Sequence, residues 1–591
     1  MNTRLLDPSL TPRAVADAAP FNGAALLIQT LLDLGVDTVF GYPGGAVLPL
    51  YDALHAEPRL RHVLVRHEQA AVHAAQGYAR STGRVGVVFV TSGPGMSNTT
   101  TGLLDSLCDS IPVLCVSGQV ATTALGTDAF QECDALGISR TVTKWNRQVS
   151  DVRELEALVR EAHAQARGPR PGPVLIDFPK DLQLQAAPRS SPQGLPAVSQ
   201  PRVLPYQALV EAVDLIARST RPVLYGGGGL INSGADACRA FTELARLSGM
   251  PCTLTLMGLG AFPASDPQWL GMLGMHGTLE ANLAMHHADL IVCVGARFDD
   301  RVTGRLDAFC PKAQVIHIDV DPASINKVVQ TDVRLVGDAG EMLTALLERL
   351  QKRDLDSTRL ARWWKRIEAW RARRSLAFED RKDAIVPQAL MTELQRQLSD
   401  RDVVVSTDVG QHQMWAAQYL QFEQPGRWLT SGGAGTMGYG LPAAIGAQIA
   451  HPERTVVCVS GDASIQMNIQ ELSTAVQHRT PVKVILSNNG YMGMVRQWQE
   501  LIHGGRYSHS YTAALPDFVM VARGFGWQAR RVERRDELEA ALAECLASEG
   551  PFFLDVVVAA EENCFPMIPA GCGHHEVLLG RDRPFVDDGA D

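Results

Sequence analysis

The sequence predicts an α/β protein with three doubly wound parallel-sheet domains. At 591 residues, the chain has room for about three domains of roughly 150–200 residues each. Short apolar runs rich in β-branched residues alternate with helical segments, a pattern typical of parallel strands joined by helical crossovers. Two distant parts also share one order: a helix ending GYAR precedes VGVVFV and TSGPG, as AAIGAQIA precedes TVVCVS and GDAS. This match indicates a duplicated α/β unit flanking a third domain.

Composition favours a globular protein and argues against nucleic acid as the main partner. The chain is 46% hydrophobic and 20% charged, with a net charge of −10. One basic run, Leu360 to Arg374, has Trp363, Ile367 and Trp370 at helical spacing. We therefore expect a helix packed through its aromatic residues rather than an RNA-binding arm.

Cysteine usage and hydropathy indicate a cytoplasmic protein that does not enter a membrane. The eleven cysteines include no CxxC pair, and Cys115, Cys293 and Cys458 lie inside apolar strand runs, as small buried residues in a reducing compartment do. No apolar segment approaches the ~18 residues of a membrane span. The first twenty residues lack the apolar region of a signal peptide.

Changes in composition divide the chain into domains and connecting segments. The division is a flexible N-terminal tail 1–20, a first domain 21–185, a linker 186–205, a middle domain 206–350, a helical linker 351–386, a third domain 387–560 and a C-terminal tail 561–591.

The first domain begins with a helix after Phe21, followed by the strand and turn TVFGYPGG. A second strand leads to a helix that opens near His67 and Glu68. The HExxH zinc motif fails here because position 71 is Ala71. Glu68 could be no more than a favourable contact with the helix dipole.

In the middle domain, strands alternate with helices and glycine-rich turns follow the strand ends. RPVLYGGGG, DLIVCVGARFDDRVTG and VIHIDVDPASINK are examples. This order suggests a Rossmann-like sheet for a nucleotide-sized ligand. No intact GxGxxG is present, so the residues leave the ligand open.

The third domain holds the most informative stretch, Thr455 to Val495. We expect a buried strand over 456–460, a helix over about 467–477 and a second buried strand over 482–487. Gly461-Asp462 and Asn488-Asn489 follow the two strands, and carboxylate and amide oxygens suit Mg²⁺. Gly461 lets the backbone approach a phosphate closely. The alternative is an ordinary crossover with polar loops.

With these pieces in place, the chain resembles the catalytic large subunits of acetolactate synthase, a family of thiamine diphosphate enzymes. The resemblance runs from about Asn22 to Leu579. It is carried by FGYPGG, RHEQAA, TSGPG, GTDAFQE, RPGPVLIDFPKD, GMLGMHGT, GARFDDRVTG, TDVGQHQMWAAQ, GTMGYGLPAA, the GD…NN unit and MVRQWQ. It implies pyrimidine-binding, central Rossmann-like and diphosphate-binding domains, in that order.

The resemblance also implies an activity and its catalytic residues. Pyruvate would be decarboxylated and joined to a second pyruvate or to 2-oxobutyrate, giving 2-acetolactate or 2-aceto-2-hydroxybutyrate, at the start of valine, leucine and isoleucine biosynthesis. Glu68 would bond N1′ of the cofactor pyrimidine, and Met437 would hold the cofactor bent. The residues implied as catalytic are Glu68, Gln131, Lys180, Met437, Arg301 and Trp498.

Cofactor and substrate contacts follow from the same resemblance. Thiamine diphosphate would contact Glu68, Gly44, Asn98, Val409, Gln411, His412, Gly435, Met437, Gly461, Asp462, Ala463, Ser464, Asn489, Tyr491 and Met492. Mg²⁺ would be held by Asp462, Asn489 and the Tyr491 carbonyl. FAD, which takes no part in net redox chemistry in the family, would contact Arg170, His276, Gly277, Thr278, Gly295, Arg297, Asp319, Asp321, Gly337 and Asp338. The substrate contacts would be Phe130, Gln131, Met275, Arg301, Val409 and Trp498.

Two of these residues have plain alternatives. Without the surrounding motif, Arg301 would be a surface ion pair with Asp299 or Asp300, and Trp498 could equally be core packing. Ala463 and Asn488 stand where relatives often show Gly and Asp.

The resemblance implies a homodimer or dimer of dimers, because the family's active site joins the first domain of one subunit to the third domain of its partner. A small regulatory subunit is a further candidate partner. The competing functions are an FAD-dependent pyruvate oxidase and another thiamine diphosphate 2-oxo acid decarboxylase. RFDDRVTG and MVRQWQ favour the synthase over the oxidase, and the acceptor role of Arg301 favours it over decarboxylases.

Overall fold

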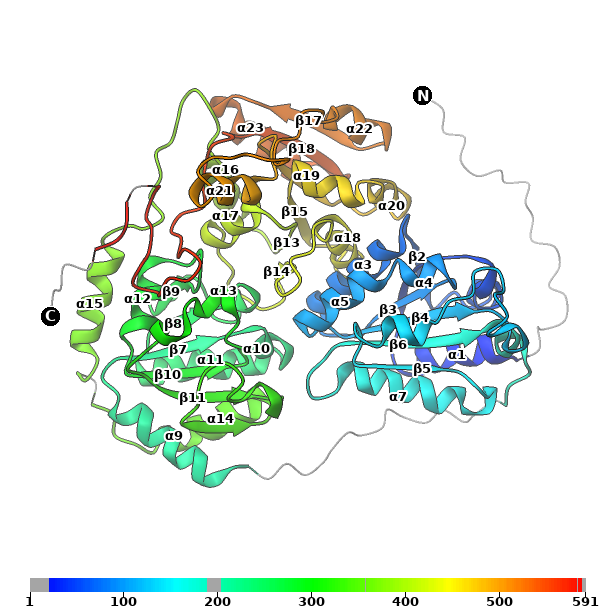
Figure 1. Ribbon diagram of the computed structural model, residues 1–591, viewed down its shortest axis with the longest axis horizontal. Coiled ribbons are helices and arrows are strands. Elements are labelled where there is room, and N and C mark those ends of the chain that lie inside the picture. The colour runs from blue at the N-terminus through cyan, green and yellow to red at the C-terminus, as the bar shows by residue number, and fades with distance from the viewer. Residues whose placement is uncertain (1–20, 189–203, 357, 582, 587–591) are drawn as a thin grey trace.

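The structure, a computed structural model, describes residues 21–188, 204–356, 358–581 and 583–586 and confirms three α/β domains (Figure 1). Each domain is built on a six-stranded sheet. The predicted N-terminal tail 1–20 and most of the predicted linker 186–205 lie outside the described residues. The domain boundaries given above stay predictions.

The first domain holds strands β1 to β6 and helices α1 to α8. Its strands are β1 Thr38–Tyr42, β2 Arg61–Leu64, β3 Gly86–Val90, β4 Val113–Gln119, β5 Trp145–Gln148 and β6 Pro173–Pro179. Its helices are α1 Gly23–Asp33, α2 Leu48–His55, α3 Glu68–Thr82, α4 Pro94–Ser97, α5 Thr100–Asp109, α6 Ala135–Ser139, α7 Leu155–Arg167 and α8 Lys180–Leu184.

The middle domain holds strands β7 to β12, and helix α15 follows it. Its strands are β7 Pro222–Gly226, β8 Cys252–Leu254, β9 Trp269–Met272, β10 Leu290–Val294, β11 Gln314–Asp319 and β12 Val333–Val336. The helices are α9 Tyr206–Arg218, α10 Gly228–Asn232, α11 Ala235–Ser248, α12 Leu279–His287, α13 Asp300–Thr303, α14 Ala339–Leu350 and α15 Ala361–Arg371.

The third domain holds strands β13 to β18. These are β13 Val403–Thr407, β14 Trp428–Leu429, β15 Thr455–Gly461, β16 Lys483–Asn488, β17 Gln528–Val532 and β18 Phe552–Val557. Its helices are α16 Pro387–Leu398, α17 Gln411–Tyr419, α18 Gly440–Ala450, α19 Asp462–Ile465, α20 Glu471–Gln477, α21 Gly493–Leu501, α22 Phe518–Gly524 and α23 Leu538–Ala547.

The first and third sheets have the same topology, as the repeated segment order predicts. The first sheet runs β2-β1-β3-β4-β6-β5, and the third runs β14-β13-β15-β16-β18-β17. All their neighbouring strands are parallel. In such a sheet, ligands bind beyond the carboxyl ends of the strands where the strand order reverses. That point lies between β1 and β3 in the first domain and between β13 and β15 in the third.

The middle sheet has a different order, β12-β11-β10-β7-β8-β9, and is also parallel. Counted from β7, this is the 3-2-1-4-5-6 order of dinucleotide-binding sheets. Its order reverses between β7 and β10, where Gly226 and Val294 end the two strands. The topology therefore fits the Rossmann-like fold expected from the sequence.

The first and third domains share one hydrophobic core. Along β3, Val87 and Phe89 face a core made with α1, α2 and α7, whereas Val88 and Val90 face a core that continues into the third domain. Burial on both faces is expected for strands of a parallel sheet.

Helices α3 and α18, which come from the duplicated segments, cross in the middle of this shared core. A Cβ added to Gly77 would lie 2.0 Å from the Ala443 carbonyl oxygen, and one added to Gly446 would lie 1.9 Å from that of Ala74. Each glycine thus meets the residue three positions before the other, so the contact has an approximate twofold symmetry. Only glycine allows the two backbones to approach so closely.

The basic segment is a packed helix, as expected. Trp363, Ile367 and Trp370 of α15 are buried, which confirms a packed amphipathic helix. The three cysteines expected to be buried, Cys115, Cys293 and Cys458, are buried and free.

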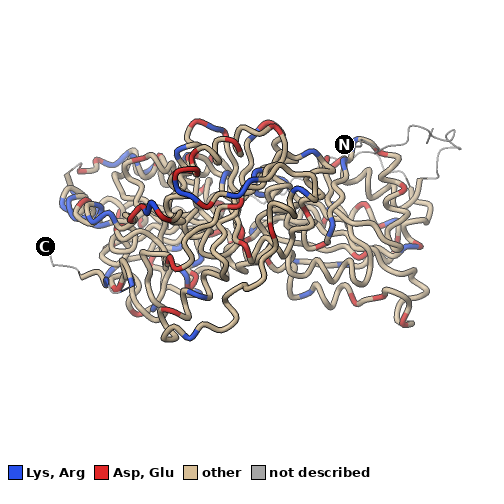
Figure 2. The backbone as a smooth tube through the Cα atoms, turned by 90° about the horizontal axis from the view of Figure 1, so that it is seen from above, with Lys and Arg blue, Asp and Glu red and all other residues tan. Residues whose placement is uncertain are grey.

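Figure 2 shows acidic and basic residues interspersed along the chain. No helix in the described ranges is long and apolar enough to cross a membrane.

The helix expected over 467–477 is interrupted. Helix α19 begins at Asp462, a 3₁₀ turn covers Gln466–Asn468, and α20 starts only at Glu471. The side chain of Asn468 donates a 2.7 Å hydrogen bond to the Gly438 carbonyl. This tertiary contact accounts for a local break that helical periodicity does not reveal.

The helix crossing predicts that Gly446→Ala destabilises the protein. In an exposed helix this change stabilises by up to ~1 kcal/mol, but here the methyl group would meet the α3 backbone, and overpacking costs about 1–3 kcal/mol. Thermal unfolding should therefore show a lowered midpoint. Gly524→Ala is the control, because nothing lies within 4 Å of its added Cβ. Equal midpoints for the two variants would contradict the close approach.

Candidate functional site

A cavity of about 260 Å³ lies beyond the carboxyl ends of β13, β15 and β16 in the third domain. It occupies the point where the strand order of the third sheet reverses, as the general rule for α/β sheets expects. All third-domain residues predicted to contact thiamine diphosphate line it: Val409, Gln411, His412, Gly435, Met437, Gly461, Asp462, Ala463, Ser464, Asn489, Tyr491 and Met492.

The wall of this smaller cavity suits an anion. Helices α17 and α21 begin at Gln411 and Gly493, and both residues line the cavity. Helix N-termini carry unsatisfied N–H groups and a partial positive charge. In addition, Nε2 of the buried His412 has no hydrogen-bond partner among the described residues. These groups could hold an anionic group such as a diphosphate.

A single carboxylate, Asp462, faces the same cavity. Its Oδ1 accepts a 3.4 Å hydrogen bond from the backbone N–H of Asn489, while its buried Oδ2 has no partner in the part of the chain that the structure describes. Burial raises the pKa of Asp462 to about 7. An unpaired carboxylate oxygen beside an amide and a phosphate-sized cavity fits a divalent cation.

The described residues contain no cluster of three or more His, Cys, Asp or Glu side chains that could hold a metal. The predicted Mg²⁺ set is of another kind, because it combines one carboxylate with the Asn489 amide oxygen and the Tyr491 carbonyl. The Asn489 Oδ1 also accepts the backbone N–H of Tyr491 at 3.1 Å. This bond holds the two residues together on one loop.

The loop of residues 431–438 carries Met437 into the smaller cavity. Asp408, which follows β13, accepts the Gly438 N–H at 2.7 Å through Oδ1 and the Ser460 hydroxyl at 3.0 Å through Oδ2. Asn468 donates to the Gly438 carbonyl. Gly438, the residue after Met437, is therefore held through both its N–H and its carbonyl group. The sequence predictions did not include Asp408 or Asn468.

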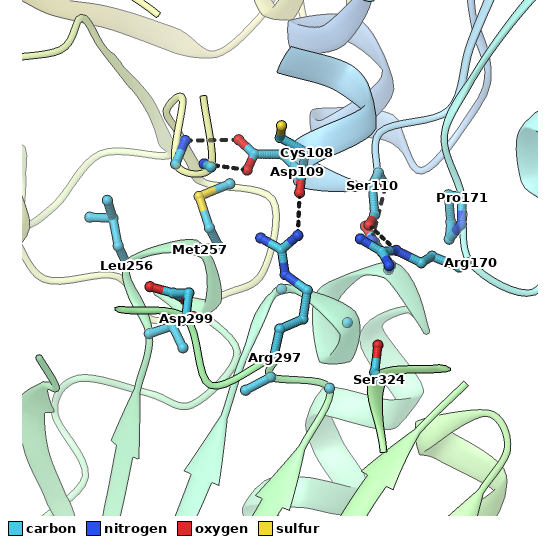
Figure 3. A pocket seen from close by; sticks show the side chains of 18 of the residues that line it. Cys108, Asp109, Ser110, Arg170, Pro171, Leu256, Met257, Arg297, Asp299 and Ser324 are labelled. Carbon is cyan, nitrogen blue, oxygen red and sulfur yellow. Dashed lines mark hydrogen bonds between the residues drawn. The ribbon is translucent and has the colours of Figure 1, made fainter. Parts of the chain in front are cut away.

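A larger cavity, about 1030 Å³, opens where the three domains meet (Figure 3). Its volume is at the upper end for small-molecule sites. Six predicted FAD contacts line it: Arg170, His276, Gly295, Arg297, Asp319 and Asp338. Gly295 follows β10, at the point where the strand order of the middle sheet reverses.

Four other predicted FAD contacts, Gly277, Thr278, Asp321 and Gly337, are not among the lining residues. Thr278 caps α12 by accepting the Ala281 N–H. Asp321 forms an ion pair with Arg170 at 3.1 Å. Asp321 is thus connected to the cavity through Arg170, which lines it.

Polar groups of the larger cavity join the domains. Arg297 donates to the Cys108 carbonyl at 2.7 Å, which joins the middle domain to the first. Arg170 donates to the Ser110 hydroxyl at 3.0 Å within the first domain and pairs with Asp321 of the middle domain at 3.1 Å. Figure 3 shows both guanidinium groups beneath the end of α5. Within the described ranges, the buried Nε2 of His276 has no hydrogen-bond partner. Two arginines and an unsatisfied imidazole nitrogen in a nucleotide-sized cavity fit a dinucleotide with a charged diphosphate.

Three predicted substrate contacts, Met275, Arg301 and Trp498, line the larger cavity together. The alternative for Arg301, an ion pair, is present only as a 3.9 Å contact with Asp300, and the Arg301 side chain is 66% exposed. Trp498 is partly buried on the cavity wall. It lies on α21, whose residue Met494 lines both cavities.

The remaining predicted residues all belong to the first domain. Glu68 is the first residue of α3, and its Oε2 accepts a 2.9 Å hydrogen bond from Asn98. Gly44 packs against Thr91, and Gln131 packs against Gly93. Lys180 begins α8 at the end of β6. None of these described side chains, nor Phe130, is in the lining of either cavity.

The start of α3 is tied to the third domain. The backbone N–H of Arg66 donates to Glu471 of α20 at 3.0 and 3.2 Å, and Glu471 also accepts the Thr474 hydroxyl. Burial raises the pKa of Glu471 to about 7. The contact fixes the chain two residues before Glu68.

Sequence reasoning missed several residues of the larger cavity. They are Gly228, Gly229, Asn232, Ser233, Asp299, Ser324, Met494 and the segments 108–110 and 431–434. Gly228 and Gly229 could have been predicted, because the sequence shows a glycine-rich turn directly after β7. Segments 108–110 and 431–434 are about 320 residues apart, and no local pattern links them.

Comparison with known proteins gives three matching domain families. Residues 21–138 match the thiamine pyrophosphate enzyme N-terminal TPP binding domain, residues 209–346 the central domain, and residues 408–556 the C-terminal TPP binding domain. Thiamine pyrophosphate is another name for thiamine diphosphate.

Curated relatives cover nearly the whole chain. The acetolactate synthase isozyme 3 large subunit of Escherichia coli (strain K12) is 48% identical over 571 residues, 95% of this chain and 99% of the relative. The isozyme 2 large subunit of the same organism is 47% identical, covering 94% and 99%. The mitochondrial acetolactate synthase catalytic subunit of Saccharomyces cerevisiae (strain ATCC 204508 / S288c) is 44% identical, covering 94% and 83%.

The raised pKa of Glu471 predicts a pH-dependent stability. Its folded pKa of about 7 lies above the ordinary 4.5, so its protonated form favours the folded state. This contribution is complete below the ordinary pKa and is lost as pH rises through about 7, at most about 3 kcal/mol. Glu471→Gln can accept the same backbone bond without titrating.

Unfolding midpoints of the wild type and Glu471→Gln, measured across this pH range, should therefore diverge, with the wild type losing stability relative to the variant as pH rises. Parallel pH profiles would show that Glu471 does not titrate in this way.

Proposed function

Because the chain belongs to the acetolactate synthase large-subunit family of thiamine pyrophosphate enzymes, we propose that it decarboxylates pyruvate, releasing CO₂, and joins the remaining two-carbon unit to a second 2-oxo acid. With pyruvate as acceptor the product is 2-acetolactate, and with 2-oxobutyrate it is 2-aceto-2-hydroxybutyrate. The observation that carries the proposal is the smaller cavity, where Asp462 Oδ2 and His412 Nε2 are both buried without partners among the described residues. A bound diphosphate and its cation would satisfy both atoms.

The third domain would hold the anionic end of thiamine diphosphate. Asp462, the Asn489 amide oxygen and the Tyr491 carbonyl would hold Mg²⁺, while His412 and the N-termini of α17 and α21 would face the phosphates. When bound, the cofactor supplies a carbon nucleophile that accepts the electrons left by decarboxylation. The chain's own residues bind it, orient it and keep water away.

Met437 would orient the cofactor, because the fixed Gly438 peptide holds this side chain in the cavity. Glu68 would hold a proton at N1′ of the pyrimidine. Its Oε2 is bonded to Asn98, so the carboxylate keeps one orientation toward the aminopyrimidine. Well-oriented groups of this kind can save on the order of 7 kcal/mol of the barrier.

The acceptor substrate would bind in the larger cavity. Arg301, with only a long contact to Asp300, would pair with the acceptor carboxylate, a planar group that suits a guanidinium. Met275 and Trp498 would pack on its alkyl chain. Trp498 would then favour 2-oxobutyrate, which has one more methylene than pyruvate. Phe130, Gln131 and Lys180 would close the site from the first domain.

We propose that the complete site forms between two copies of the chain. Glu68 lines neither cavity of the described chain, so one chain would offer two separate half-sites. Phe130, which precedes Gln131 and is 89% exposed, would be covered by the partner chain. A dimer, or a dimer of dimers, would bring each first-domain group to the third domain of the partner.

The larger cavity would also hold FAD. Arg170 and Arg297 would face its diphosphate, and Asp319, at the end of β11, would accept ribose hydroxyls. No step of the reaction depends on it. The relatives are named large subunits, which supports a smaller partner subunit for this chain. A cytoplasmic location stays a prediction.

A product assay tests the proposal. Protein supplied with thiamine diphosphate, Mg²⁺ and FAD should convert pyruvate to 2-acetolactate anaerobically and without flavin reduction. Added 2-oxobutyrate should divert product to 2-aceto-2-hydroxybutyrate. Trp498→Leu should keep 2-acetolactate formation and lower the proportion of the larger product. Flavin reduction by pyruvate would identify the alternative oxidase, and acetaldehyde without ligation would identify a decarboxylase.

A further inference from the structure

The two cavities share one wall, the loop of residues 431–438. Residues 431–435 line the larger cavity, and Gly435 and Met437 line the smaller one. A shift of this loop would therefore change both cavities at once. The contacts that fix the loop therefore affect both binding sites.

Two carboxylates of helix α5, in the first domain, hold this loop of the third domain. Asp109 accepts the Gly433 N–H through Oδ1 at 2.7 Å and the Gly432 N–H through Oδ2 at 2.8 Å. Figure 3 shows these two bonds above the larger cavity. Hydrogen bonds to an ionised acceptor are stronger than neutral ones, and two consecutive N–H groups form a natural cradle for it.

Asp105, one turn earlier on α5, holds the two flanks of the loop. Its Oδ1 accepts the Ser431 hydroxyl and, at 3.0 Å, the Thr436 hydroxyl. The Ser431 hydroxyl oxygen in turn accepts the Thr436 N–H at 2.8 Å. The loop is thus closed on itself and anchored at its closure by a buried carboxylate.

The contact also leaves little room for a side chain at Gly432 or Gly433. A Cβ added to Gly433 would lie 2.8 Å from the Cys108 Cβ, and one added to Gly432 would lie 2.3 Å from the Met257 sulfur of the middle domain. The loop is therefore seated between the end of α5 and the middle domain. This close approach explains the glycines at positions 432 and 433.

We propose that Asp109, assisted by Asp105, is a positioning residue that sets the 431–438 loop and thereby the shape of both cofactor cavities. The first domain of each chain would then have two separate tasks. It presents Glu68 at its own edge, and it fixes the loop that carries Met437 in the third domain. This inference rests on the proposed function for the identity of the ligands, but the geometry of the loop stands apart from it.

Asp109→Asn tests the inference with little change in volume. The amide replaces one acceptor oxygen with an NH₂ group that faces a backbone N–H, so at least one bond to the loop is lost. Binding of thiamine diphosphate with Mg²⁺, and of FAD, is measured by titration of the cofactor-free protein. We expect both dissociation constants to rise about tenfold or more. Amide hydrogen exchange should accelerate over 431–438 and not over 461–464.

The matched control is Glu423→Gln. Glu423 also accepts a backbone N–H across a domain boundary, that of Ser265 at 3.0 Å, but it lines neither cavity. This variant should leave exchange and both dissociation constants unchanged. Should Asp109→Asn fail to fold, Ser431→Ala removes the Asp105 bond from the loop side and should give the same result.

Unchanged exchange over 431–438 in a folded variant would overturn the inference. Faster exchange with unchanged affinity for both cofactors would also overturn it, because the loop would then move without consequence. A wild-type protein that does not bind thiamine diphosphate would instead contradict the proposed function, and the exchange measurement would still decide whether Asp109 holds the loop.

Discussion

The crossing of α3 and α18 is the contact on which the rest of the structure depends. Gly77 and Gly446 let the two helix backbones meet, with added Cβ atoms within about 2 Å of carbonyl oxygens. The first and third domains consequently share one hydrophobic core instead of meeting at a polar, hydrated interface. Glu68 stands at the start of α3, and the loop with Met437 leads directly into α18. One close approach of two helices therefore fixes the chain around two elements of the proposed site.

Duplication explains how one fold supplies both ends of a cofactor site. The first and third sheets have the same strand order, so each has a reversal point with loops at its carboxyl edge. In the third domain, helix N-termini and the Asp462 carboxylate lie at this edge, and they suit a diphosphate and a cation. In the first domain, Glu68 and glycine turns lie at the corresponding edge. The end of α5 then connects all three domains, since Asp109 bonds the third and Cys108 the middle domain.

Sequence patterns were sufficient for the architecture and for the placing of Asp462 and Asn489 at neighbouring strand ends, whereas the other predicted third-domain contacts came from the family resemblance. Apolar runs and helical crossovers predict parallel sheets, and Asp462 and Asn489 follow two such strands in one βαβ unit, so their convergence can be inferred. The carboxylates that hold the 431–438 loop could not be found in this way. Asp105 and Asp109 look like ordinary helix residues, because their partners lie more than 300 positions away. Helical periodicity also missed the break before α20, since a tertiary bond from Asn468 sets it.

Mixing two inactive variants tests most directly whether the proposed site joins two chains. Glu68→Gln removes the carboxylate that the first domain contributes, and Asp462→Asn removes the carboxylate that the third domain contributes. Each variant alone should therefore be inactive. If the site lies between subunits, a mixed dimer has one intact site, and random pairing should restore up to about a quarter of the wild-type carboligation activity. A co-refolded mixture in which mixed dimers form, yet which stays as inactive as its components, would contradict the account.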